Sequence, residues 1–138
     1  MAGYSGTPLV KKLGIKAGFR VGFVNAPKGF RQKLESMPAD VRVLTGQLIK
    51  PLDLAILFAG SEEVLKKEFS KLATLLASNG VLWVAWPKKS SGVVTDLSFD
   101  NVQHVGLDAG LVDVKICAIN EIWSGLKFVY RLKDRKSI

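Results

Sequence analysis

The sequence predicts one three-layer α/β domain, with a mostly parallel sheet of about six strands and an antiparallel strand at its C-terminal end. Three observations support this fold class. The length of 138 residues suits one domain with a sizeable core. Short β-branched and aromatic runs alternate with stretches of helical periodicity. The last two runs are close enough in sequence to form a hairpin.

The first predicted strand is Phe19–Asn25, a run of aromatic and β-branched residues that stops at Ala26-Pro27. After it, Phe30, Leu34 and Met37 recur at helical spacing. This spacing predicts a short helix that must end before Pro38, because the residue before a proline disfavours helical geometry.

Two further strands follow in the first half of the chain. Residues Val41 to Thr45 form the second predicted strand, and Asp53 to Phe58 form the third. The third run is hydrophobic at every position after its aspartate, which is typical of a parallel strand covered on both faces.

The next segment predicts an amphipathic helix that begins after Ser61. This serine is a suitable N-cap, and Glu62 and Glu63 complement the positive end of the helix dipole. We expect Asn79-Gly80 to end the helix in the left-handed conformation. Its apolar face consists of Val64, Leu65, Phe69, Leu72, Ala73 and Leu76.

The fourth predicted strand is Val81–Trp86, which is followed by a polar loop over Lys88–Asp96. Ser98 is expected to cap a second helix that ends before Gly110.

The chain then ends in a predicted hairpin. Strands over Val112–Ile119 and Leu126–Leu132 are separated by Glu121–Gly125, and this spacing favours antiparallel pairing. Residues 1–8 are expected to be a leader, and Lys133–Ile138 a frayed tail, so that residues 1–138 form a single domain.

This order of elements resembles a shortened class I methyltransferase-like fold, a Rossmann-like sheet whose last strand runs antiparallel. Three local segments agree with the resemblance, which covers about residues 9–132. They are Lys16–Val21 before the first strand, Leu52–Ile56 in the third and Ser78–Leu82 entering the fourth.

More closely, the sequence resembles a small bacterial family of uncharacterised proteins. The segments that carry this resemblance are Tyr4–Leu9, Trp83–Lys89, Gly110–Lys115 and Trp123–Lys127. The family implies the same fold and brings no established activity.

The sequence departs from methyltransferases at the residues that hold their cofactor. Members that bind S-adenosylmethionine have a glycine-rich turn after the first strand and an acidic residue near the end of the second. Here the turn is Asn25-Ala26-Pro27-Lys28-Gly29, and the second strand ends in Leu44-Thr45-Gly46-Gln47. We therefore expect no S-adenosylmethionine binding in the usual mode, and no cofactor is predicted.

Ligands of open α/β sheets bind at the carboxyl ends of the strands where the strand order reverses, here between the first and third strands. The loops around this crevice predict a site for a small anion such as phosphate or carboxylate, aided by the amino end of the helix after Ser61. The alternative is that the lysines are solvated loop charges. The predicted ligand-binding residues are Asn25, Lys28, Ser61, Trp86, Lys88 and Lys89.

Two of the three tryptophans, Trp86 and Trp123, each have two interpretations. Trp83 and Trp86 lie three apart in one strand and so point to opposite faces. We expect Trp83 in the core, whereas Trp86 could either pack in the core or form the floor of the crevice. Trp123, in the hairpin loop, could cover the end of the sheet or contact a partner.

The sequence gives little support for a metal site or for acid–base catalysis. His104 is the one histidine and Cys117 the one cysteine, so no ordinary zinc site is predicted. We expect His104 on the helix surface and Cys117 as a buried, inert thiol. Asp96 and Asp113 are not expected to pair, and Asp96 could orient the lysine loop or cap the turn.

The net charge of +8 lies mainly in residues 1–50, with nine basic and two acidic side chains, against eleven and ten in residues 51–138. Such an excess favours nucleic-acid binding. However, Phe19, Phe23 and Phe30 fit core positions, so a base-stacking platform is not predicted. Nucleic acid is therefore a less favoured partner than a small anionic ligand, and no membrane partner is expected.

The sequence thus predicts a cytoplasmic domain, since a single cysteine suits a reducing compartment. Its expected role is that of a non-catalytic ligand-binding or interaction module for a small anion or an acidic partner. A divergent enzyme that uses the same crevice and a basic nucleic-acid-binding protein are the alternatives. The oligomeric state is left open.

Overall fold

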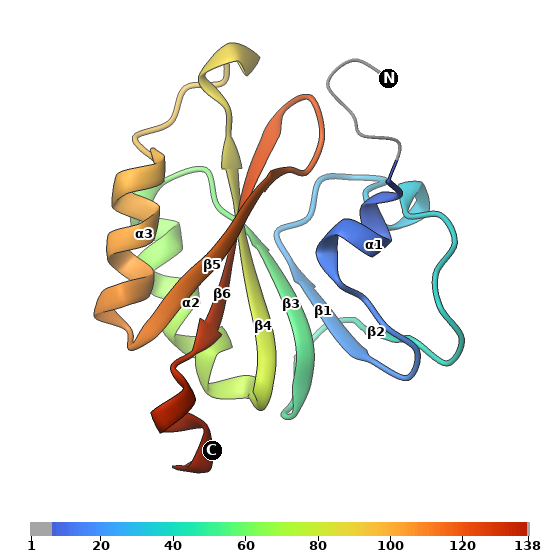
Figure 1. Cartoon of the computed structure of the whole chain (residues 1–138). Coiled ribbons are helices and arrows are strands. Elements are labelled where there is room, and N and C mark those ends of the chain that lie inside the picture. Colours follow the sequence, from blue (N-terminus) through green and yellow to red (C-terminus); the bar gives the residue numbers. More distant parts are fainter. Residues whose placement is uncertain (1–6, 138) are drawn as a thin grey trace.

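The computed structural model describes residues 7–137 and contains one six-stranded sheet with the order β2-β1-β3-β4-β6-β5 (Figure 1). This confirms the predicted α/β fold class. The predicted leader lies mostly outside the described residues. The strands are β1 (Arg20–Val24), β2 (Arg42–Leu44), β3 (Leu52–Phe58), β4 (Leu76–Pro87), β5 (Leu111–Ala118) and β6 (Trp123–Tyr130). The helices are α1 (Leu9–Leu13), α2 (Glu62–Leu75) and α3 (Phe99–Asp108).

The sheet is parallel from β2 to β4 and antiparallel at β6. Strand β1 pairs in parallel with β2 and β3, and β3 pairs in parallel with β4. Strand β6 is antiparallel to both β4 and β5. The strand order reverses between β1 and β3, as the sequence predicts, so the carboxyl ends of β1, β3 and β4 meet at one edge of the sheet.

Helices cover both faces of the sheet, with α2 and α3 on one side and α1 on the other (Figure 1). Strand β3 supplies side chains to both layers: Ala55 and Leu57 pack on the α2 and α3 side, and Leu54, Ile56 and Phe58 pack on the α1 side. The prediction that this strand is covered on both faces is therefore confirmed.

The two tryptophans of β4 point to opposite layers, as their spacing predicts. Trp83 is fully buried on the α1 side, where its Nε1 donates a hydrogen bond of 2.9 Å to the carbonyl oxygen of Leu13. Trp86 is 5% exposed and packs on the α2 and α3 side. The indole of Trp83 thus satisfies its polar atom while it fastens the end of α1 to the sheet.

The helix predicted around Phe30 is wrong in extent, because this segment contains a single 3-10 turn, η1 (Arg31–Lys33). A short segment before Pro38 gains few hydrogen bonds for the entropy that helix nucleation costs. Phe30 is instead held by edge-to-face contacts with Phe23 and Phe58, at ring-centroid distances of 5.5 and 4.9 Å.

The predicted left-handed end of α2 at Asn79-Gly80 is also wrong. The helix ends at Leu75, and Leu76 is already extended and begins β4. A Cβ atom on Gly80 would lie 2.8 Å from the carbonyl oxygen of Leu52, so this glycine allows two backbone segments to approach closely.

The second half of the chain follows the prediction more closely. Helix α3 begins with a capping box between Ser98 and Asn101, and Gly110 is left-handed with a φ of 92°. The hairpin is antiparallel, but Trp123 is the first residue of β6 and not part of the turn.

The expected frayed tail forms a 3-10 helix, η3 (Leu132–Ser137). Arg135 supports it, because its Nε donates a hydrogen bond of 3.1 Å to the carbonyl oxygen of Tyr130. Across the described residues, no helix combines the length and apolar character needed to cross a membrane.

The contact between α3 and β6 predicts a destabilising effect of Gly106→Ala. A Cβ atom at this position would lie 2.0 Å from Cε1 of Phe128, which is fully buried and packs edge-to-face on Phe69. We expect the free energy of unfolding to fall by about 1–3 kcal/mol in urea titrations, although alanine favours helix more than glycine does.

Gly60→Ala is the control for this prediction, because nothing lies within 4 Å of a Cβ atom built on Gly60. It should change stability by about 0.5 kcal/mol or less. Equal stability of the two variants would show that α3 does not pack on Phe128 in the way described.

Candidate functional site at the carboxyl edge of the sheet

A cavity of about 350 Å³ lies between the end of β4 and the start of α3, and we call it the β4–α3 cavity. Three of the residues that the sequence predicts as a ligand site, Trp86, Lys88 and Lys89, line it together. Strand β6 contributes Ser124, which pairs with Trp86 in the antiparallel register. The remaining lining residues are Pro87, Leu97, Ser98, Phe99 and Asp100.

The lysine loop is held in place by backbone hydrogen bonds. The amide of Lys88 donates a hydrogen bond of 2.8 Å to the carbonyl oxygen of Ile122, in the β5–β6 turn. The hydroxyl of Ser91 donates a hydrogen bond of 2.6 Å to the carbonyl oxygen of Lys88, within the 3-10 turn η2 (Lys89–Ser91). Both lysines are therefore carried by a fixed backbone, with Lys89 exposed and Lys88 half-buried.

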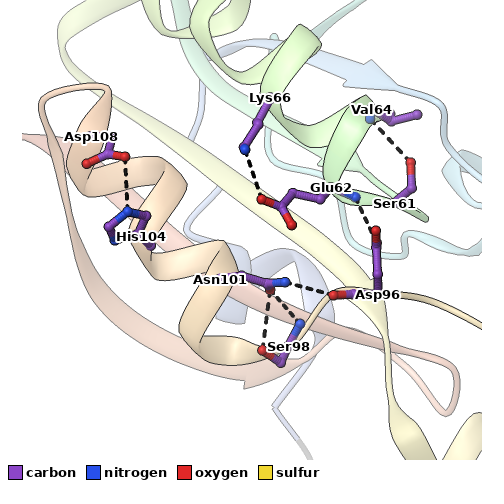
Figure 2. Close-up of polar contacts among 9 residues, drawn as sticks. All are labelled: Ser61, Glu62, Val64, Lys66, Asp96, Ser98, Asn101, His104 and Asp108. Carbon is purple, nitrogen blue, oxygen red and sulfur yellow. Dashed lines mark hydrogen bonds and ion pairs between the residues drawn. The ribbon is translucent and has the colours of Figure 1, made fainter.

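The amino end of α3 forms the opposite wall of the cavity. The amide of Ser98 donates to Oδ1 of Asn101 at 2.6 Å, and the Ser98 side chain caps the helix in return. Asn101 also donates to the carbonyl oxygen of Asp96 at 2.7 Å (Figure 2). The positive end of the α3 dipole and the two lysines therefore act on the same cavity, and both favour an anion.

Asp96 and Thr95 tie the loop before α3 to the start of α2. The carboxylate of Asp96 accepts a hydrogen bond of 2.9 Å from the amide of Glu62 (Figure 2). The hydroxyl of Thr95 donates a hydrogen bond of 2.7 Å to the carbonyl oxygen of Gly60. Asp96 thus caps a helix that begins 34 residues earlier in the chain, and it does so beside Ser61.

The other predicted site residues lie elsewhere. The hydroxyl of Ser61 accepts a hydrogen bond of 3.3 Å from the amide of Val64, so it serves as the N-cap of α2. Asn25 is exposed, with a φ of 58°, and lines a separate cavity beside α2. Lys28 is exposed in the turn after β1 and lines neither of these two cavities.

The second cavity, of about 360 Å³, lies between α2 and the ends of β1 and β2. Besides Asn25 it is lined by Glu68 and Lys71, whose charged atoms are 3.9 Å apart, and by Gly46 and Leu48 of the loop after β2. Sequence reasoning missed Glu68 and Lys71 because they lie on the polar side of an ordinary amphipathic helix. It also missed the role of Asp100 and Ser124, whose approach to Lys88 depends on the tertiary fold.

The residues at the ends of β1 and β2 do not fit S-adenosylmethionine in the mode that the methyltransferase fold implies. Pro27 has no backbone N–H to offer a ligand in the turn after β1. Residues 45–47 after β2 contain no carboxylate that could accept hydrogen bonds from ribose hydroxyls. The nearby Glu68 is paired with Lys71. These residues therefore do not reproduce the usual cofactor site of that fold.

The other residues that the sequence singles out lie in surroundings that give no sign of a reactive site. His104 is exposed, and its Nε2 lies 3.2 Å from Asp108 on the same helix (Figure 2). Cys117 is half-buried, and burial raises the pKa of its thiol, an effect that Lys115 and Lys12 partly oppose. A raised pKa disfavours the reactive thiolate. Trp123 is half-buried and packs edge-to-face on Phe58 at 5.1 Å.

Metal binding has no structural support in the described part of the chain. It contains no group of three or more histidine, cysteine, aspartate or glutamate side chains placed to hold an ion.

The chain resembles known proteins in its fold and not in its sequence. No family profile and no curated protein sequence matches the chain. A methyltransferase from Aquifex aeolicus that depends on S-adenosylmethionine has a TM-score of 0.60 at 16% identity, over 87% of this chain and 86% of its own.

Two further structures give the same result. The fibrillarin pre-rRNA processing protein of Methanococcus jannaschii has a TM-score of 0.60 at 11% identity, over 84% of this chain and 68% of its own. The magnesium protoporphyrin IX methyltransferase of Synechocystis, with S-adenosylmethionine bound, has a TM-score of 0.58 at 13% identity, over 89% and 74%. The chain has a methyltransferase-like Rossmann fold.

The hydrogen bond between Asp96, in the loop before α3, and the first residue of α2 predicts a stability loss for Asp96→Ala. The substitution leaves the amide of Glu62 without its carboxylate acceptor, so we expect the free energy of unfolding to fall by about 1 kcal/mol. Asp108→Ala is the matched control, because Asp108 is exposed and its carboxylate contacts His104 on the same helix. Its effect should stay within about 0.5 kcal/mol. Equal losses in chemical denaturation would contradict the capping role of Asp96.

Proposed function

We propose that the protein is a divergent enzyme of the methyltransferase-like fold that acts on a small anionic substrate bound in the β4–α3 cavity. The observation that carries this proposal is the meeting of Lys88, Lys89 and the amino end of α3 around one cavity at the carboxyl edge of the sheet. This edge is where open α/β sheets bind their ligands, although the cavity lies beside β4 and not at the predicted crevice between β1 and β3, where the strand order reverses. Two of the three proteins of similar fold are methyltransferases, which supports an enzyme more than a non-catalytic module.

The lining of the cavity supports a substrate with both an anionic and an apolar part. The ammonium groups of Lys88 and Lys89 would bind a phosphate or carboxylate, and Ser124 would add a hydroxyl. Trp86 and Phe99 would contact a hydrophobic portion.

Asp100 is the one carboxylate among the residues that line this cavity. In the enzyme proposal it accepts a proton from the substrate, a role that requires hydrogen-bond contact with the substrate. A non-catalytic ligand-binding module is the second candidate, and the loss of the usual cofactor residues after β1 and β2 favours it.

Two wider proposals accompany the function. We propose that the chain belongs to the uncharacterised bacterial family that it resembles, on the strength of Trp83–Lys89, which forms the end of β4 and the first wall of the cavity. We also propose a cytoplasmic location, which the single cysteine supports.

Ligand binding is tested by thermal shift with a panel of phosphorylated and carboxylated metabolites, with S-adenosylmethionine as a separate arm. A ligand at 100 times its Kd should stabilise the protein by about 2.7 kcal/mol and raise its Tm. The double variant Lys88→Glu/Lys89→Glu should weaken binding at least about tenfold, because it replaces two attractive charges with repulsive ones.

The matched control is Lys50→Glu/Lys67→Glu, which changes the net charge equally at exposed positions outside the cavity. A ligand that loses affinity equally in both double variants is attracted by net charge alone, and such a result would reject the cavity as the site.

The variant Asp100→Asn distinguishes the enzyme proposal from the proposal of a non-catalytic binding module. We expect the ligand found above to be converted by the wild-type protein, as followed by mass spectrometry, and to bind to the variant with its turnover lowered about 10²-fold or more. Unchanged turnover would remove Asp100 from the reaction. A ligand that binds at Lys88 and Lys89 but is never converted would favour the module.

A further inference from the structure

Three lysines that are far apart in the sequence gather on the α1 side of the sheet. Lys115 of β5 and Lys127 of β6 are paired across the two strands, and Lys127 is in turn paired with Trp83 of β4. Lys16 follows the end of α1, which is fastened to that same Trp83. We call Lys16, Lys115 and Lys127 the lysine cluster.

Electrostatic effects agree with this geometry. Burial lowers the pKa of the Lys127 ammonium, and the charges of Lys115 and Lys16 lower it further. Lys127 is therefore close enough to both Lys115 and Lys16 for their charges to act on it. The ion pairs of the described residues are Lys66–Glu62, Lys71–Glu68 and His104–Asp108, so none of them supplies a carboxylate to the cluster.

The fold gains little from this arrangement. Like charges placed directly opposite on neighbouring strands destabilise a sheet. Lys115 has a partial structural role, because its Nζ lies 3.4 Å from the carbonyl oxygen of Lys12 in the last turn of α1. Within residues 7–137, no such contact accounts for the half-buried Lys127 or the exposed Lys16.

We propose that the lysine cluster binds a phosphate group of a ligand, at a site separate from the β4–α3 cavity. The two sites lie on opposite faces of the sheet, because Lys127 packs toward α1 whereas Trp86 and α3 belong to the other layer. Binding of an anion would offset the repulsion that Lys115 and Lys16 exert on Lys127.

Phosphate suits the cluster better than a carboxylate does. Three ammonium groups around one half-buried position favour a compact group that can carry two negative charges and accept several hydrogen bonds, and phosphate does both. Lysine binds phosphate as a point charge, with three donors that can turn toward its oxygens. This phosphate could come from a free phosphorylated molecule or from the backbone of a nucleic acid.

The experiment measures two probes on the full chain and separates these sources. Inorganic pyrophosphate represents a free phosphorylated molecule, and a short fluorescein-labelled single-stranded oligonucleotide represents a phosphodiester chain. Binding is followed by calorimetry for the first probe and by fluorescence anisotropy, over a range of salt concentrations, for the second.

The test variant is Lys16→Glu/Lys115→Glu, since both side chains are exposed and their replacement leaves the core intact. We expect it to weaken binding of at least one probe about tenfold or more. If the oligonucleotide is that probe, the slope of log K against log salt should fall by about 1.4, because each lost phosphate contact contributes about 0.7 for a single strand.

Two controls make the proposal falsifiable. Lys50→Glu/Lys67→Glu has the same net charge as the test variant and should retain wild-type affinity within about twofold. Lys88→Glu/Lys89→Glu should also retain wild-type affinity, which distinguishes the lysine cluster from the β4–α3 cavity. Equal weakening in all three double variants would overturn the proposal, and so would the absence of binding to both probes.

Polyglutamate is the last control. If it binds with the affinity of the phosphate probes and shows the same dependence on Lys16 and Lys115, the cluster recognises negative charge in general, and the assignment to phosphate is wrong.

Discussion

The burial of β3 on both faces is the constraint from which the rest of the architecture follows. Residues Leu54 to Leu57 have no exposed surface, and alternate side chains enter the two layers. Each leucine or isoleucine side chain among them contributes roughly 1.5–3 kcal/mol only if it is covered. Helices α2 and α3 cover one face. On the other face a five-residue helix is sufficient because Trp83 binds its last turn through the Leu13 carbonyl, and Phe30 fills the space beside it.

Patterns within one element predicted the fold, whereas contacts between elements decided the details that were missed. The two-sided hydrophobic run of β3 and the Ser98 cap are local, and both are found as predicted. Gly80 has its role because of Leu52, which lies 28 residues earlier, so a turn-forming pair such as Asn79-Gly80 is misleading there. The position of Phe30 is likewise set by its contacts with Phe23 and Phe58 and not by a helical period.

The candidate site was predictable in part, for a similar reason. Trp86, Lys88 and Lys89 lie at the end of one buried strand, so their place at the carboxyl edge was predictable, whereas their cavity lies beside β4 and not between β1 and β3. The partners across the cavity come from α3 and β6, and Asn25 lines a different cavity that Glu68 and Lys71 of α2 help to form. The lysine cluster depends on a bulge in β5 between Asp113 and Lys115. In a regular strand these residues would share a face. Here Asp113 accepts from Gln103 of α3, and Lys115 reaches α1.

Strand β6 links the two charged regions and also keeps them apart. Ser124 lies opposite Trp86 and lines the β4–α3 cavity, whereas Lys127 lies opposite Trp83 on the α1 side. Their separation of three positions places them on opposite faces of the sheet. The low-dielectric core between these faces contains no buried charged side chain among the described residues. An anion bound on one face therefore leaves the lysines of the other face free to bind a second, so that the two regions can be tested independently.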